Sequence, residues 1–171
     1  MCVLTRDQIL DEIERGRLRI DPFDPDRVGP ASIDLHLGAE IRVLDTDRSE
    51  PVDVEGGESV PELTRVVEFD AGFVLEPGET VHGITQERLM LPPDLCGWLE
   101  GRSSVARLGL TIHATSGFVH PGVQNHQVLE MSNLSRVPLR LRPGIRICQV
   151  VLERTEGQAV YRGRFAGQTA P

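Results

Sequence analysis

The sequence predicts a mainly β fold, a distorted antiparallel barrel or jelly roll, for three reasons. Helical periodicity is not sustained beyond residue 16. Short runs of β-type residues then follow one another through the rest of the chain. Turns rich in proline and glycine separate these runs. Many short strands punctuated in this way are typical of an antiparallel barrel or jelly roll.

The first expected element is a short amphipathic helix over residues 5–16. Thr5 is placed to act as its N-cap, and Gly16 is placed to end it. Its apolar stripe consists of Ile9, Leu10 and Ile13. This spacing puts the three side chains on one face of the helix.

The expected strands occupy the remainder of the chain. In the first half they cover residues 32–37, 40–44, 63–68, 72–75 and 80–85. In the second half they cover residues 97–100, 110–113, 127–131, 137–141 and 145–152. Turns are expected at residues 76–78, 91–93, 120–122 and 142–144. Residues 46–61 are expected to form an acidic loop, and residues 163–171 a flexible tail. The length of 171 residues is that of a single domain.

The charge composition restricts the possible ligands. The formal net charge is -8, which argues against a broad electrostatic contact with DNA or RNA. All 18 basic side chains are arginine, so neither lysine Schiff-base chemistry nor a lysine-containing phosphate loop is available. A local arginine cluster can still hold an anionic ligand, because the guanidinium fork matches phosphate oxygens.

Neither a membrane segment nor a zinc site is expected. No apolar run approaches the roughly 18 residues that span a bilayer, and the first residues do not resemble a signal peptide, so a cytoplasmic protein is expected. Cys2, Cys96 and Cys148 lack the spacing of a zinc site, and the last two are expected to be small buried side chains. The His-x-Glu and Pro-Cys-x-x-Cys motifs of zinc-dependent nucleobase deaminases are also missing from the sequence.

The segment 101–110, Gly-Arg-Ser-Ser-Val-Ala-Arg-Leu-Gly-Leu, is a candidate anion site. Ser103 or Ser104 can cap a short helical turn that Gly109 closes, with Arg102 and Arg107 on the same element. The alternative is a capped surface turn with solvated arginines. The residues alone favour neither interpretation over the other.

A second candidate group surrounds Glu130, which follows Val-Leu in the expected strand 127–131. A carboxylate among apolar neighbours is either paired or has its pKa raised by desolvation, so that it exchanges protons near neutral pH. The alternative is a residue on the solvent face of a half-buried sheet, and strand alternation alone favours that alternative.

Together these segments resemble the dCTP deaminases, a family of the dUTPase-like superfamily. The resemblance rests on residues 101–110, on His-Ala-Thr-Ser-Gly-Phe-Val-His-Pro-Gly at 113–122, and on Val-Leu-Glu at 128–130. It extends to segments at 20–22, 30–38, 73–79, 91–95 and 141–149. Arg-Phe-Ala-Gly-Gln at 164–168 resembles the Lys-Tyr-x-x-Gln of the family's closing tail. In this order and at this spacing the motifs cover nearly the whole chain.

The resemblance implies a homotrimer with a pyrimidine nucleotide bound at each subunit boundary. It implies that Glu130 is the general base for a water molecule, that Ser103 and the backbone at Ser116 hold this water, and that Arg107 lies near the pyrimidine. The implied triphosphate ligands, usually with Mg²⁺ across the phosphate oxygens, are Arg102, Ser104, Tyr161, Arg164 and Gln168. Further implied substrate contacts are Thr115, Gly117, Phe118, His120 and Gln149. No metal ligand from the chain, no nucleic-acid polymer and no membrane partner is implied.

Three positions depart from the family pattern. His120 replaces an aspartate that lies against the sugar, which argues against triphosphate cleavage and leaves room for a ribonucleotide or a modified sugar. Ser116 replaces an alanine, and residues 123–126, Val-Gln-Asn-His, replace a segment with an aromatic and a glycine. The remaining histidines, His36, His82, His113 and His126, are expected to be satisfied, solvated or structural side chains.

The primary expectation is therefore conversion of dCTP to dUTP and ammonia by a carboxylate-activated water without zinc. Three alternatives remain. They are deamination of another cytosine nucleotide such as CTP, CMP or a modified intermediate, a dUTP diphosphatase or bifunctional enzyme, and a nucleotide-binding trimer without catalysis.

Overall fold

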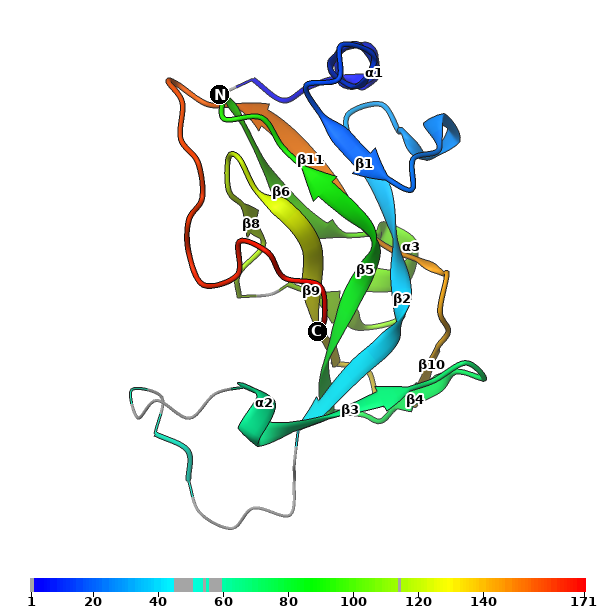
Figure 1. Cartoon of the computed structure of the whole chain (residues 1–171). Helices are drawn as coiled ribbons and strands as arrows, with labels where there is room; N and C mark the ends of the chain where they lie inside the picture. The colour runs from blue at the N-terminus through cyan, green and yellow to red at the C-terminus, as the bar shows by residue number, and fades with distance from the viewer. Residues whose placement is uncertain (1, 45–50, 54, 56–59, 114) are drawn as a thin grey trace.

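The computed structural model describes residues 2–44, 51–53, 55, 60–113 and 115–171. Most of the acidic loop expected over 46–61 lies outside these described residues. The mainly β prediction is confirmed, since strands form most of the regular structure (Figure 1). No helix in the described part is long and apolar enough to cross a membrane.

The N-terminal helix α1 spans Arg6–Glu14, in agreement with the sequence. Ile9 is fully buried, and Gly16 has the positive φ of 70° expected after the helix end. Thr5 takes the N-cap position, but its side chain makes no capping hydrogen bond. The sequence did not predict the next two elements, β1 (Arg19–Asp21) and the 3₁₀ helix η1 (Pro25–Arg27).

One curled antiparallel sheet forms the body of the molecule (Figure 1). Its central path runs β7, β9, β5, β2, β11, β6, β8, and β1 and β3 pair with β5 and β2. The bounds are β2 Ile33–Leu44, β3 Thr64–Glu68, β5 Thr80–Met90, β6 Leu95–Gly101, β7 Leu110–Ile112, β8 Phe118–Val119, β9 Gln124–Asn133 and β11 Arg146–Arg154. A small second sheet pairs β4 (Phe73–Leu75) with β10 (Leu139–Leu141), and the short helices α2 (Val60–Leu63) and α3 (Ser103–Ala106) precede β3 and β7.

Two long strands differ from the sequence prediction in a way that shapes the site. The strands expected at 32–37 and 40–44 are one strand, β2, whose pairing with β5 shifts between Leu37 and Ile41. Strand β5 extends five residues past the predicted end at Thr85, with a shift in its pairing to β9 between Ile84 and Arg88. Such irregularities bend a strand and redirect its side chains.

Alternation along β5 and β9 separates a core face from a pocket face. Val81 and Gly83 on β5 pair with Met131 and Leu129 on β9, and all four are buried. Cys96 and Cys148 are also buried, as expected from the sequence. A Cβ added at Gly83 would lie 2.6 Å from the Met131 side chain, so the core leaves no room there. The residues between these positions therefore point to the opposite face.

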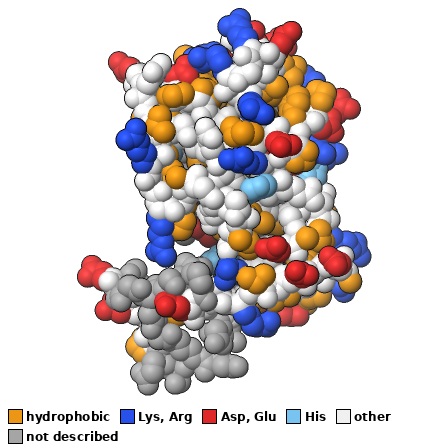
Figure 2. All heavy atoms as spheres, viewed as in Figure 1, with side chains coloured by type: hydrophobic (Ala, Val, Ile, Leu, Met, Phe, Trp, Pro, Cys, Tyr) orange, Lys and Arg blue, Asp and Glu red, His pale blue; other side chains and the backbone are white. Residues whose placement is uncertain are grey.

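The surface is chemically mixed. On the face shown in Figure 2, arginine, acidic and apolar side chains alternate, and the described residues form no continuous basic area on that face. This mixture agrees with the formal net charge of -8.

Candidate active site

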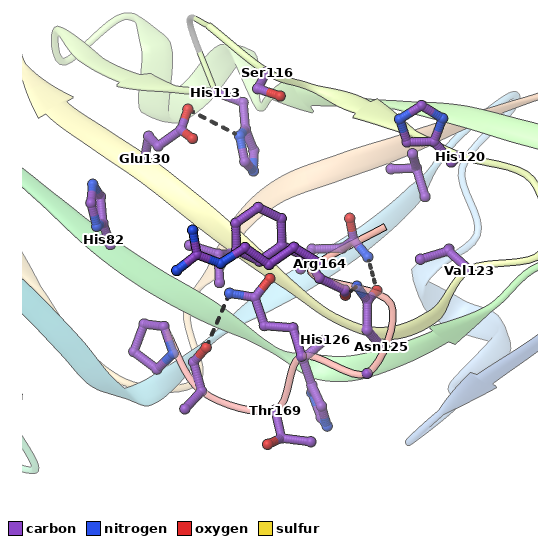
Figure 3. A pocket seen from close by; sticks show the side chains of 18 of the residues that line it. His82, His113, Ser116, His120, Val123, Asn125, His126, Glu130, Arg164 and Thr169 are labelled. Carbon is purple, nitrogen blue, oxygen red and sulfur yellow. Dashed lines mark hydrogen bonds and ion pairs between the residues drawn. The ribbon is translucent and has the colours of Figure 1, made fainter. Parts of the chain in front are cut away.

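A cavity of about 590 Å³ lies on the pocket face of β5 and β9. Its other walls are the segment that carries His113, Ser116, Phe118 and His120, and the C-terminal segment from Tyr161 onward (Figure 3). A cavity of this size is typical of sites for small molecules. Glu130 is the single acidic side chain among the described residues that line it.

Four charged or titratable side chains form a row across the strands that carry this cavity. Arg42 of β2 pairs with His82 of β5, and His82 pairs with Glu130 of β9. The backbone N–H of His113 donates to the carbonyl oxygen of Glu130 at 3.0 Å, which extends the row by one chain segment. All four residues line the cavity.

Glu130 is a paired carboxylate, which is one of the two states that its sequence context predicted. The Thr115 hydroxyl donates to Glu130 Oε2 at 2.6 Å, and His113 Nδ1 lies 3.6 Å from the same oxygen. The contact with His113, opposed by partial burial and assisted by Thr115, lowers the pKa of Glu130 from 4.5 to about 2. The side chain remains 35% exposed, so a ligand in the cavity can reach it.

His113 is more closely involved than its expected structural role suggested. Its backbone has a φ of 51°, the left-handed conformation that few residues other than glycine adopt. Its side chain is 5% exposed, and neither ring nitrogen makes a hydrogen bond to the described residues. The ring therefore lies with Nδ1 towards Glu130, and Nε2 has no hydrogen-bond partner among the described residues.

His82 was expected to be a satisfied or solvated strand residue, and the structure instead places it in the cavity wall (Figure 3). Burial lowers the pKa of His82, with Glu130 opposing the shift and Arg42 adding to it. The sequence offered no local signal for this position, because only the pairing of β5 with β9 brings His82 opposite Glu130.

Aromatic rings form a second wall of the cavity. His120 stacks on Tyr161 with ring centroids 4.9 Å apart and an interplanar angle of 8°. Phe118 meets the edge of His120 at 4.8 Å and contacts Trp98 at the same distance. Flat rings of this kind can pack on a nucleobase or on the apolar face of a sugar.

The C-terminal segment lies against the cavity in the described structure. The backbone N–H of His126 donates to the carbonyl oxygen of Gln168, and the Asn125 side chain donates to that of Phe165. Arg164 and Gln168, both expected phosphate ligands, line the cavity with Tyr161. The expectation that this segment moves to close over a nucleotide stays a prediction.

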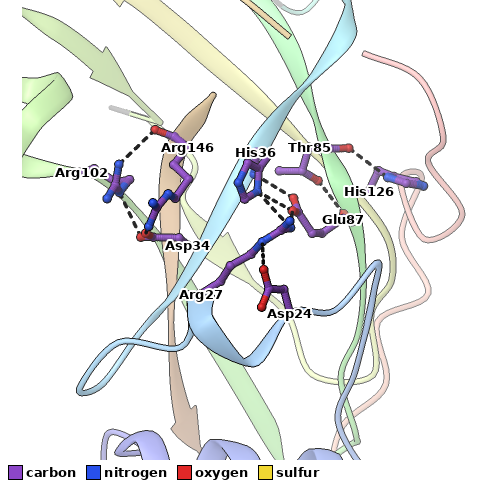
Figure 4. Close-up of polar contacts among 9 residues, drawn as sticks. All are labelled: Asp24, Arg27, Asp34, His36, Thr85, Glu87, Arg102, His126 and Arg146. Carbon is purple, nitrogen blue, oxygen red and sulfur yellow. Dashed lines mark hydrogen bonds and ion pairs between the residues drawn. The ribbon is translucent and has the colours of Figure 1, made fainter. Parts of the chain in front are cut away.

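The other expected site residues lie outside this cavity. Arg102, Ser103, Ser104, Arg107 and Gln149 are not among the residues that line it. Arg102 Nε donates to Asp34 Oδ1 at 3.0 Å, and Arg146 reaches the other oxygen of the same carboxylate (Figure 4). Gln149 accepts from Ser32 and donates to the carbonyl of Gly101.

The predicted serine cap of α3 is wrong. Arg102 occupies the N-cap position, and no side chain caps the helix. Ser103, Ser104 and Arg107 are exposed, and their side chains have no hydrogen-bond or ion-pair partner among the described residues. Gly109 ends the turn with a φ of 88°, as expected.

Thr115 and Gly117 flank Ser116 in the chain but do not line the cavity themselves. Thr115 holds Glu130, and the Gly117 carbonyl accepts from the backbone N–H of Leu99. A Cβ on Gly117 would lie 3.0 Å from the Leu99 carbonyl oxygen, so the close approach of these two segments requires a glycine.

Comparisons with known proteins agree on one family. The profile of the dCTP deaminase-like family matches residues 3–155. A protein of Streptomyces griseus named "dCTP deaminase, dUMP-forming" is 43% identical over 178 residues, covering 99% of this chain and 92% of the relative. A protein of the same name from Acidothermus cellulolyticus is 43% identical over 180 residues, covering 100% of this chain and 93% of that relative.

A solved structure shows the same fold. The crystal structure of 2'-deoxycytidine 5'-triphosphate deaminase from Agrobacterium tumefaciens superposes with a TM-score of 0.69 at 26% identity. The match covers 90% of this chain and 48% of that one, so this chain spans about half the length of the Agrobacterium protein.

Proposed function

The chain belongs to the dCTP deaminase-like family, and from this premise we propose that it is a hydrolase that removes the 4-amino group of a cytosine deoxynucleotide. The expected substrate is dCTP. The observation that carries the proposal is the position of Glu130, a single carboxylate in the wall of a cavity large enough for a nucleotide. Thr115 fixes one of its oxygens, and the structure shows no partner for the other among the described residues.

Glu130 is placed to act as the base that activates water. As water adds to C4 of the cytosine ring, Glu130 takes one proton from it and delivers this proton to the ring nitrogen N3. Glu130 then takes the remaining proton of the C4 hydroxyl and passes it to the amino group, so that the C4–N bond breaks, ammonia leaves, and a C4 carbonyl with a protonated N3 remains. A bound base would shield the carboxylate from solvent, which raises a pKa of about 2 towards the range in which a base accepts protons readily.

We further propose that α3 completes the cavity of a neighbouring copy in a trimer. Ser103 and Arg107 are exposed and lie outside the cavity of their own chain. In this arrangement Ser103 would orient the water, and Arg107 would stabilise charge near the pyrimidine. Preorganised hydroxyl and guanidinium groups of this kind commonly supply a large part of the rate enhancement.

The residues of the cavity fit a magnesium ion carried by the substrate. Arg164 and Gln168 can contact phosphate oxygens, whereas Glu130 is the single acidic side chain of the described lining and is the proposed base for the water. Mg²⁺ prefers oxygen ligands and usually keeps substrate phosphates among them. The proposed water activation uses the Glu130 carboxylate, in agreement with a sequence that lacks the motifs of zinc deaminases.

The names of the relatives and the sequence of this chain favour different products of the reaction. The two relatives above are named as dUMP-forming, which implies loss of pyrophosphate as well as ammonia. We propose dUTP for this chain, because His120 offers a stacked imidazole where the family pattern has an aspartate. Formation of dUMP is the second candidate, and the names of the relatives favour it.

One assay separates these possibilities. Purified protein is incubated with dCTP, CTP, dCMP or dUTP in the presence of Mg²⁺, and ammonia and pyrophosphate are measured separately. We expect ammonia from dCTP without pyrophosphate. Pyrophosphate in equal amount would establish the dUMP-forming reaction, and faster release of ammonia from CTP would establish a ribonucleotide substrate. Absence of ammonia from every cytosine nucleotide would refute the proposed function.

A further inference from the structure

His82 is one of the cavity residues to which neither the sequence nor the family pattern assigned a catalytic or binding role. It occupies the middle of the cross-strand row, with Arg42 on the β2 side and Glu130 on the β9 side. Because directly paired residues of adjacent strands have Cβ atoms roughly 5 Å apart, its ring is an immediate neighbour of the Glu130 side chain. The imidazole makes no hydrogen bond to the described residues, and its place opposite Glu130 follows from the pairing of β5 with β9.

We propose that His82 is a positioning residue for Glu130, which in its neutral form leaves the carboxylate able to accept a proton and in its protonated form prevents this. The inference rests on the proposed function, because it concerns the same carboxylate and the same water.

The charges around Glu130 determine how readily its carboxylate accepts a proton. His113 and Thr115 already stabilise the carboxylate form, so this group has little affinity for a proton. A positive charge at His82 would stabilise the carboxylate further and weaken it as a base. A neutral imidazole at the same place adds no charge, but it can still accept or donate one hydrogen bond.

The surroundings of His82 keep the ring neutral near pH 7. Partial burial lowers its pKa from 6.5, and Arg42 contributes in the same direction. Glu130 opposes this shift, so the protonation of the two residues is coupled. The other charged or titratable side chains of the described lining are Arg164, Tyr161, His113, His120 and His126 (Figure 3).

Because the two residues are coupled, protonation of His82 should lower kcat for ammonia release at acidic pH, which gives the rate profile an acid limb. Below pH 6.5 we expect wild-type kcat for ammonia release to fall about tenfold per pH unit once His82 is protonated. In His82→Leu the ring is replaced by a side chain that cannot titrate, and we expect kcat to change by less than about threefold between pH 7 and pH 5. His126→Gln is the matched control and should keep the wild-type limb, because His126 bonds to the Thr85 carbonyl rather than facing Glu130.

A titration of the histidine side chains by NMR tests the coupling without turnover. In wild type, His82 should titrate below pH 6.5. Glu130→Gln removes the group that raises its pKa and should move the titration lower, whereas Arg42→Gln should move it higher. A residue that merely fills space would not respond in opposite directions to these two changes.

The outcomes distinguish the two proposals. If wild type releases ammonia and His82→Leu keeps the acid limb, the role of His82 is refuted and the proposed function stands. If no cytosine nucleotide is deaminated, the proposed function fails, and the NMR titration alone decides whether His82 and Glu130 are coupled. An unchanged His82 titration in Glu130→Gln refutes the coupling, and this measurement remains decisive even if His82→Leu does not fold.

Discussion

Two glutamates of the main sheet, Glu87 and Glu130, each lie beside a histidine but have opposite environments. Glu87 is 1% exposed and accepts three hydrogen bonds, two from the ring and backbone of His36 and one from Arg27 (Figure 4). Glu130 is 35% exposed, accepts one hydroxyl hydrogen bond, and has His113 at 3.6 Å. The first carboxylate has its acceptor capacity largely occupied, whereas the second has an oxygen that can meet a ligand.

The two environments give the same residue type different roles. A buried carboxylate with several donors contributes to the native structure, and the loss of its charge leaves its partners unpaired. A half-exposed carboxylate in a cavity wall contributes little to stability but can act on a substrate. The clearest tests of the comparison change each glutamate in the same way and measure both activity and stability.

The largest expected effect is on catalysis. Glu130→Gln keeps the size of the side chain and removes the proposed base, so we expect kcat to fall about 10³-fold, which corresponds to about 4 kcal/mol. The midpoint of urea unfolding should stay close to that of wild type. Normal turnover by this variant would mean that another group activates the water.

The next effect is on stability. Glu87→Gln leaves Arg27 and His36 without their carboxylate in the most buried part of the network, so we expect the free energy of unfolding to fall by about 3 kcal/mol. Urea denaturation measures this loss, and kcat per folded molecule should remain much closer to wild type than in Glu130→Gln. A loss of kcat equal to that of Glu130→Gln, with unchanged stability, would abolish the distinction between the two glutamates.

A smaller effect is expected at Thr115. Thr115→Val removes the hydroxyl that donates to Glu130 and should raise the pKa of this carboxylate from about 2 towards 4.5. Because the folded-state pKa lies below the ordinary value, Glu130 makes a contribution to stability above pH 4.5 that is lost as the pH falls towards 2, and this contribution is small because solvent screens the half-exposed side chain. NMR titration of the Glu130 carboxyl carbon measures the shift, and an unchanged pKa would show that His113 alone determines it.

The smallest expected effect concerns His120. His120→Asp restores a fixed negative charge where the family pattern has one, so we expect pyrophosphate release from dCTP to rise relative to ammonia release, by about tenfold or less. The control is the same ratio in wild type under identical Mg²⁺ concentration. An unchanged ratio would show that His120 does not determine the product.

The sequence predicted the features that depend on local patterns. Alternation and Pro/Gly turns sufficed for the mainly β fold, and Gly16 and Gly109 take the backbone conformations expected of them. Strands β1, of three residues, and β8, of two residues, were missed. Strand β2 was divided in two at the irregularity between Leu37 and Ile41.

The candidate site was harder to predict because it depends on contacts between distant segments. The resemblance to a family identified Glu130, whereas strand alternation alone favoured a solvated residue. His82 lies 48 positions earlier in the chain, and only the register of β5 on β9 brings the two together. The serine cap of α3 was predicted wrongly, since the segment instead begins at Arg102, which is anchored by Asp34 of β2.

The proposed division of the site between two copies is tested most directly by mixing two inactive variants. Glu130→Gln lacks the base in the cavity, and Arg107→Ala lacks the guanidinium on α3; each alone should show little ammonia release. When the two chains are expressed together and assemble at random, about a quarter of the boundaries combine an intact cavity with an intact α3, so about a quarter of wild-type activity should return. Full inactivity of the mixed trimers, with assembly confirmed, would show that Glu130 and Arg107 do not act together across a subunit boundary.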